Sequence, residues 1–150
     1  MQLRLITWNV NGLETTRLDA RMEKICLELV LGIPLKDAMA GAPSPPMPEV
    51  IALQEVVRRA HLAQLQRHLG AAGFTLYPEE PPRAEGDYTL LAVRPPWRLE
   101  AAETVPFELS PLGRAYVAAE LAQGAARVRV LTGHLESLRS GADARIAQVL

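Results

Sequence analysis

Three strand-like runs in this chain each end near a polar residue of a type that binds ligands or metals. The runs and their polar residues are Leu3–Trp8 with Asn9, Val50–Leu53 with Glu55, and Arg127–Thr132 with His134. Short runs rich in apolar and β-branched residues predict β-strands, and we expect the first two of these strands to be buried. Sites gather where strands end, because the loops there expose side chains on a rigid frame. The sequence therefore predicts a sheet protein with a candidate site at three strand ends.

The rest of the chain alternates between helical and strand-like patterns. We expect a helix over 18–30, ended by Gly32 and Pro34, and a second helix over 62–69, closed by Gly70 or Gly73. Strands are expected at 74–77, 88–93 and 115–121, with a hairpin turn at Gly124. A Ser140–Asp143 capping box predicts the start of a last helix, which has Ile146 in its apolar stripe. This order predicts a mixed α/β (α+β) fold in one domain over residues 1–150.

Residues 41–48 read Gly-Ala-Pro-Ser-Pro-Pro-Met-Pro. Four prolines in this segment forbid regular secondary structure, so we expect a stiff surface loop inserted into the domain. A plain connector is the simpler interpretation, and a polyproline segment that docks a partner is the alternative.

Composition narrows the class of protein. Hydrophobic residues make up 49% of the 150 residues and charged residues 22%, as in globular domains. The net charge of −1 excludes a global basic field for non-specific nucleic-acid binding. One cysteine, Cys26, excludes an internal disulfide, and we expect no disulfide-linked partner. No run is apolar enough to span a membrane, so a cytoplasmic protein is the default expectation.

The three strand-end residues suit metal and phosphate chemistry. Glu55 can hold a hard cation such as Mg²⁺, Asn9 can orient a phosphate or a carboxylate, and His134 can donate to an oxyanion. Each also has a structural interpretation: Asn9 as a turn former, Glu55 as a helix-start acid, and His134 as a packed histidine. Zinc-ligand spacing, a Walker loop and a Gly-x-Ser-x-Gly elbow are all missing from the sequence. We expect His61 and His68 at solvated helix positions, and Cys26 in the core.

Taken together, these motifs resemble the endonuclease/exonuclease/phosphatase superfamily. The matching segments are Ile6-Thr7-Trp8-Asn9-Val10-Asn11-Gly12-Leu13, Leu53-Gln54-Glu55-Val56 and Thr132-Gly133-His134-Leu135-Glu136-Ser137. The tyrosyl-DNA phosphodiesterase branch is the most similar. The segments that favour it are Arg139 after the histidine motif, Arg145 with Gln148, Gly86-Asp87-Tyr88-Thr89, Val105-Pro106-Phe107 and Arg114.

The resemblance implies a deoxyribonuclease-I-like fold, a partial four-layer αββα sandwich. It also implies a hydrolase of the nuclease or DNA-repair kind, with Mg²⁺ as cofactor, Mn²⁺ as the alternative ion, and a phosphodiester as substrate, in DNA or in a protein–DNA adduct. The implied roles are Glu55 as metal ligand, Asn9, Glu55 and His134 as catalytic residues, Ser137, Arg139 and Asn9 at the substrate phosphate, and Tyr88 and Arg114 along a substrate channel. For Tyr88, a packed strand aromatic is the alternative.

One departure from the family pattern affects the functional expectation. The family's Gly-Asp-x-Asn motif and its late Asp-His pair do not occur in this sequence. The resemblance therefore covers the N-terminal part of the family domain, and we expect the chain by itself to be a truncated, inactive phosphodiesterase. A non-catalytic, degenerate homologue that binds phosphate or a partner is the alternative. The sequence leaves open the true substrate, the number of metals and the oligomeric state.

Overall fold

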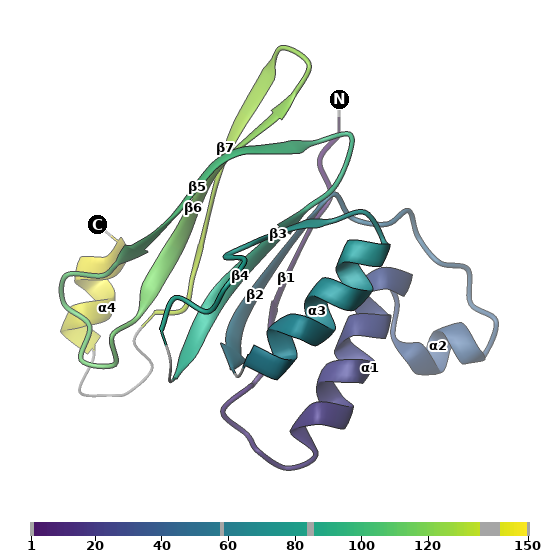
Figure 1. The fold of residues 1–150 in the computed structure, drawn as a ribbon, viewed down its shortest axis with the longest axis horizontal. Coiled ribbons are helices and arrows are strands. Elements are labelled where there is room, and N and C mark those ends of the chain that lie inside the picture. The colour runs from purple at the N-terminus through teal and green to yellow at the C-terminus, as the bar shows by residue number, and fades with distance from the viewer. Residues whose placement is uncertain (1, 58, 84–85, 136–141, 150) are drawn as a thin grey trace.

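Two β-sheets packed face to face form the centre of the structure, a computed structural model that describes residues 2–57, 59–83, 86–135 and 142–149 (Figure 1). The first sheet has the strand order β1-β2-β4-β3 and the second has the order β5-β6-β7. The elements are β1 (Leu5–Asn9), α1 (Leu18–Leu31), α2 (Leu35–Met39), β2 (Val50–Val57), α3 (Arg59–Ala71), β3 (Thr75–Tyr77), β4 (Asp87–Val93), β5 (Arg98–Pro106), β6 (Ala115–Gln123), β7 (Ala126–Gly133) and α4 (Ala142–Val149).

The first sheet carries two of the three predicted strand ends. β1 and β2 run parallel, with Leu5 beside Val50 and Asn9 beside Gln54. β2 pairs antiparallel with β4, which pairs antiparallel with β3. Because β1 and β2 are parallel, their carboxyl ends meet at the same edge of the sheet, and that edge brings Asn9 close to Glu55.

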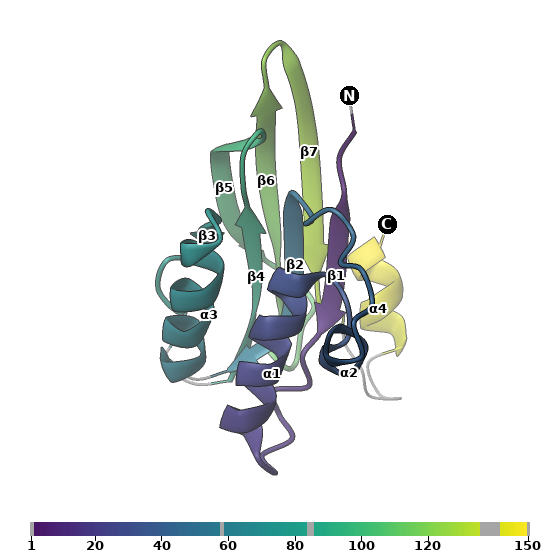
Figure 2. The same cartoon turned by 90° about the vertical axis from the view of Figure 1, so that its right-hand side faces the viewer.

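Two hydrophobic cores hold the layers together. One core lies between the first sheet and helices α1 and α3, which cover the outer face of that sheet (Figures 1 and 2). The other lies between the two sheets and is built from Val50, Ala52, Leu91, Val93, Trp97, Val117, Ala119, Leu121 and Val130. Each core removes apolar side chains from water, which is the main favourable term in folding. The inter-sheet core fixes the second sheet, and with it His134, relative to the first.

The second sheet is antiparallel throughout and has α4 beside its outer face (Figure 1). Gln148 of α4 donates from Nε2 to the backbone carbonyl of Leu109 at 3.1 Å. Ile146, expected in a packed stripe, is instead 61% exposed. The layers α, β, β, α confirm the predicted fold class, and within the described residues the short helix α4 forms the fourth layer.

Most predicted elements are confirmed, with three corrections. The first strand was expected to be buried, but β1 lies at a sheet edge and alternates between exposed and half-buried residues. Helix α2 and strand β5 were not predicted. The sequence of β5, rich in alanine and glutamate, has low β propensity, and its pairing with β6 decides its structure. Gly32 caps α1, and residues 42–48 form no helix or strand, both as predicted. The predicted cap residue Ser140 lies outside the described residues.

The expectation of solvated histidines on α3 is wrong. His61 is fully buried, and its Nε2 lies 3.1 Å from the Asp19 carboxylate of α1. His68 is partly buried, with Nε2 2.8 Å from the Glu23 carboxylate. Both histidines face α1, because α3 packs against α1 as well as against the sheet. Cys26 is buried, as predicted. None of the described helices is long and apolar enough to cross a membrane.

Candidate metal- and phosphate-binding site

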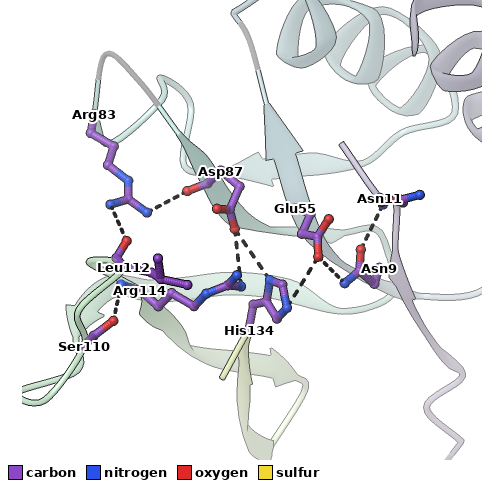
Figure 3. Close-up of polar contacts among 9 residues, drawn as sticks. All are labelled: Asn9, Asn11, Glu55, Arg83, Asp87, Ser110, Leu112, Arg114 and His134. Atoms are coloured by element: carbon purple, nitrogen blue, oxygen red, sulfur yellow. Dashed lines mark hydrogen bonds and ion pairs between the residues drawn. The ribbon is translucent and has the colours of Figure 1, made fainter. Parts of the chain in front are cut away.

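Asn9 and Glu55 form a hydrogen-bonded pair at the ends of β1 and β2. The Asn9 amide donates from Nδ2 to Glu55 Oε1 at 2.8 Å (Figure 3). The backbone N–H of Asn11 donates to Asn9 Oδ1, also at 2.8 Å. Asn9 is therefore held at both ends of its amide, as in an Asx turn. In this position it orients the Glu55 carboxylate.

A bulge in β2 turns Glu55 toward the second sheet. In a regular strand, consecutive side chains point to opposite faces, so Gln54 and Glu55 would face opposite ways. Here the pairing of β2 with β4 shifts register between Leu53 and Val56, and Glu55 has a positive φ of 58°. Both Gln54 and Glu55 consequently contact residues of the second sheet. A non-glycine residue in this conformation is strained by about 1–3 kcal/mol, and such strain is found mainly at functional sites.

His134 lies between two carboxylates that come from the first sheet. Its Nε2 lies 3.4 Å from Glu55 Oε1, and its Nδ1 lies 3.5 Å from Asp87 Oδ2 (Figure 3). The side chains of His134, Glu55 and Asp87 are 18%, 12% and 14% exposed, so all three are partly shielded from water. Both ring nitrogens therefore face negative charge, which favours donation from the imidazole.

Arg114 completes a row of alternating charges on the far side of Asp87. Its Nη1 lies 3.6 Å from Asp87 Oδ2, and its side chain is only 4% exposed. The backbone N–H of Arg114 donates to Ser110 Oγ, and Arg83 donates to the backbone carbonyl of Asp87 at 2.9 Å. Asp87 thus lies between two cationic or proton-bearing groups, Arg114 and His134 (Figure 3).

A cavity of about 170 Å³ opens beside this row of charges. Tyr88 and Arg114 line it, and His134 lies at its wall. Burial raises the pKa of Tyr88 above its ordinary value, and the nearby Glu80 charge raises it further. The Tyr88 hydroxyl has no hydrogen-bond partner among the described residues. Tyr88 is buried in the core and also lines the cavity.

The structure brings together the three residues at the predicted strand ends. Tyr88 and Arg114 lie next to that cluster, on the Asp87 side of His134, whereas Ser137 and Arg139 lie outside the described residues. Sequence reasoning assigned no role to Asp87 or Gln54, although both occur within matched motifs. An acidic residue at the start of a strand was the available signal for Asp87. The inward turn of Gln54 and Glu55 together depends on the bulge, which the sequence did not predict.

The donor set fits a hard cation bound through few protein ligands. Glu55 offers a carboxylate, and Mg²⁺ usually binds one or two carboxylates while keeping several waters. Within the described residues there is no cluster of three or more His, Cys, Asp or Glu side chains that could enclose a metal ion. Among the described residues, Glu55 therefore offers a carboxylate that could hold a hard divalent cation such as Mg²⁺ or Mn²⁺.

Known proteins of the same architecture match this chain, although no protein-family model does. The chain is 28% identical over 146 residues to tyrosyl-DNA phosphodiesterase 2 of Gallus gallus, which covers 97% of this chain and 34% of that protein. The crystal structure of TDP2 from Caenorhabditis elegans has a TM-score of 0.76 and 25% identity, and the match covers 98% of this chain and 40% of that one. TDP2 of Danio rerio, complexed with a single-strand DNA product, has a TM-score of 0.74 and 23% identity, over 98% of this chain and 51% of that one.

These similarities extend over nearly the whole of this chain but over only part of each relative. The chain spans about a third of the length of the curated relatives that it matches. The sequence-based resemblance and the deoxyribonuclease-I-like architecture are both confirmed.

Proposed function

We propose that this chain, which resembles the endonuclease/exonuclease/phosphatase superfamily in sequence and in fold, carries the metal- and phosphate-binding half of a phosphodiesterase site. The observation that supports this most directly is the convergence of three strand ends on one carboxylate. Asn9 Nδ2 and His134 Nε2 lie 2.8 and 3.4 Å from the same oxygen of Glu55. A structural role for three separate residues does not require such convergence from two sheets.

Glu55 is the proposed ligand for Mg²⁺, with Mn²⁺ as the alternative ion. When bound, the metal would act as a charge sink for phosphate oxygens. Asn9 holds one carboxylate oxygen of Glu55, which fixes the direction in which the carboxylate faces a cation. Outer hydrogen bonds of this kind often hold metal ligands in place.

His134 is proposed to donate a hydrogen bond to a substrate phosphate oxygen. Its Nε2 already points toward Glu55, where the phosphate would lie, and the Asp87 carboxylate lies 3.5 Å from the opposite ring nitrogen. Ser137 and Arg139 are proposed to contact the same phosphate, and for them the support is the sequence resemblance. An arginine there would supply a forked pair of donors.

A phosphodiester in DNA, or in a protein–DNA adduct, is the proposed substrate. The support is that the chicken relative is a tyrosyl-DNA phosphodiesterase and that the fish structure contains a single-strand DNA product. The cavity beside Tyr88 and Arg114 would take the part of the substrate that adjoins the phosphate. With a net charge of −1, the protein would rely on local contacts for affinity.

Metal binding and turnover are tested separately on the 150-residue chain. Mn²⁺ binding is measured by electron paramagnetic resonance in the wild type, in Glu55→Gln and in Glu103→Gln. The last variant is a matched control that removes one carboxylate from an exposed position on β5. We expect Glu55→Gln to weaken binding at least tenfold, and Glu103→Gln to change it less than twofold. Equal binding by Glu55→Gln and wild type would refute the metal-ligand assignment.

Hydrolysis of bis(4-nitrophenyl) phosphate with Mg²⁺ then tests whether the chain is active by itself. Turnover that is lost in Glu55→Gln would show an active enzyme and would contradict the expectation that the chain alone is inactive. Metal-dependent binding of inorganic phosphate without turnover is the result expected of the metal- and phosphate-binding half of the site, and equally of the non-catalytic binding module. Absence of both binding and turnover would refute both candidate functions.

A further inference from the structure

Gln54 connects the three strands that carry the site. Its side-chain amide Nε2 lies 3.1 Å from Thr7 Oγ1 of β1 and 3.0 Å from Thr132 Oγ1 of β7. Gln54 is only 8% exposed, and it immediately precedes Glu55 in β2. One amide group therefore bonds to the neighbouring strand of its own sheet and to the facing strand of the second sheet.

The two threonines occupy equivalent places relative to the site. Thr7 lies two residues before Asn9, and Thr132 lies two residues before His134. Residues two apart along a strand project from the same face. Each hydroxyl is therefore the group next to a site residue on the inner side of its strand, and Gln54 Nε2 has one hydrogen for each. The 3.5 Å contact of Nε2 with the Ala52 carbonyl is the longest of the three.

We infer that Gln54 is a positioning residue that sets the separation of the Asn9–Glu55 pair from His134. The inference rests on the proposed function for its consequence, because that separation matters only if one ligand contacts both sheets. The geometry supports it independently, since the link passes between the sheets beside the contact of Glu55 with His134.

A purely structural role makes a different prediction. If Gln54 only satisfies buried hydrogen bonds, removing either hydroxyl should lower stability, and the two changes should not differ in how they affect Asn9 and His134. If Gln54 positions the site, each hydroxyl should control its own strand end. Thr132→Val should displace His134 and leave Asn9 in place, whereas Thr7→Val should displace Asn9 and leave His134 in place.

The experiment uses the isotope-labelled, full 150-residue chain without metal. The His134 imidazole and the Asn9 side-chain amide are followed by NMR in Thr132→Val, Thr7→Val and Gln54→Met. Thr132→Ser keeps the hydroxyl and serves as the rescue variant. Thr75→Val, at an exposed position on β3, is the matched control for exchange of a hydroxyl for a methyl group. We expect shifts of His134 alone in Thr132→Val, of Asn9 alone in Thr7→Val, and of both in Gln54→Met, with wild-type signals in Thr132→Ser and Thr75→Val.

A second measurement ties the inference to the proposed function. Affinity for inorganic phosphate in the presence of Mg²⁺ should fall about fivefold in Gln54→Met, which corresponds to about one hydrogen bond. Unselective shifts in both threonine variants, or wild-type signals in all three, would overturn the positioning role. Failure of the wild type to bind phosphate with Mg²⁺ would instead count against the proposed function, while the metal-free shifts would still decide the role of Gln54.

Discussion

The backbone of Gly12 lies in close contact with the backbone of Glu55. A Cβ atom on Gly12 would lie 2.0 Å from the Glu55 carbonyl oxygen, which is far inside any van der Waals contact. This carbonyl belongs to the bulged, left-handed residue that carries the candidate metal-binding carboxylate. The turn after β1 and the bulge in β2 therefore fit each other only if residue 12 has no side chain.

Gly12→Ala should consequently displace Glu55. We expect a loss of about 1–3 kcal/mol in the free energy of unfolding, as for overpacked buried sites. We also expect Mn²⁺ affinity to fall severalfold, because the carboxylate loses its direction. Gly70→Ala is the control, since a Cβ there meets nothing within 4 Å. Urea unfolding and electron paramagnetic resonance measure the two effects, and unchanged Mn²⁺ affinity in a folded Gly12→Ala variant would contradict the argument.

Asp87 should be coupled energetically to Arg114. Asp87→Asn leaves the Arg114 guanidinium buried without its facing carboxylate, and we expect a loss of about 1–3 kcal/mol. Arg114→Met should cost less in the Asp87→Asn background than in the wild type, because the charge left unpaired by the first change is then removed. A double-mutant cycle based on urea unfolding measures this coupling. Strictly additive effects would show that the pair contributes nothing to stability.

The contact between Glu49 and Arg4 should make stability sensitive to acid. Burial raises the pKa of Glu49, but hydrogen bonds from the Arg4 backbone and side chain, together with the Arg4 charge, outweigh it and hold the pKa below the ordinary value of 4.5. The Arg4 backbone N–H lies 2.7 Å from Glu49 Oε2. A carboxyl group with a lowered folded-state pKa stabilises the protein fully above its unfolded pKa. This contribution disappears as the pH falls from 4.5 through the lower folded-state value.

Glu49→Gln should therefore lower stability at pH 7 by about 1 kcal/mol and flatten the decline of stability with acid below pH 4.5. Urea midpoints between pH 7 and pH 3 measure both effects. Glu103→Gln, at an exposed position on β5, should keep the wild-type slope. The prediction would be wrong if Glu49→Gln and wild type declined in parallel.

Cys26 should be unreactive in the folded protein. Burial raises the pKa of its thiol to about 12, and the Glu23 charge adds to the effect. Compared with a thiol at the ordinary value of 9.0, the thiolate fraction at neutral pH is about 1000-fold smaller. We expect iodoacetamide to label the unfolded chain rapidly and the folded chain only as it unfolds. Mass spectrometry at increasing urea concentrations checks this, and rapid labelling without urea would contradict it.

Strand-end reasoning selected three residues that lie together in the structure, because it depends only on local sequence. Asn9, Glu55 and His134 each follow a run that does form a strand, and the parallel pairing of β1 with β2 brings the first two together. The contact between His134 and Asp87 could not be predicted in this way, because it depends on how the second sheet lies on the first.

The errors have a similar cause. Helical spacing located α3 but could not show that a second helix, α1, covers the side that carries His61. The apolar run before Asn9 suggested a buried strand, yet β1 lies at the edge of its sheet and leaves Leu5 46% exposed. In both cases the local pattern indicated the element, and the neighbouring elements decided its burial.

Because the candidate site is divided between two sheets, a bound ligand should stabilise the packing of one sheet against the other. Glu55 belongs to one sheet and His134 directly follows the last strand of the other, so a ligand that contacts both can bind tightly only while the inter-sheet core is intact. By mass action, such a ligand at 100 times its Kd would add about 2.7 kcal/mol to the free energy required to separate the sheets. Thermal shift of this chain in the presence of metal and phosphate would therefore report assembly of the site as directly as any assay of turnover.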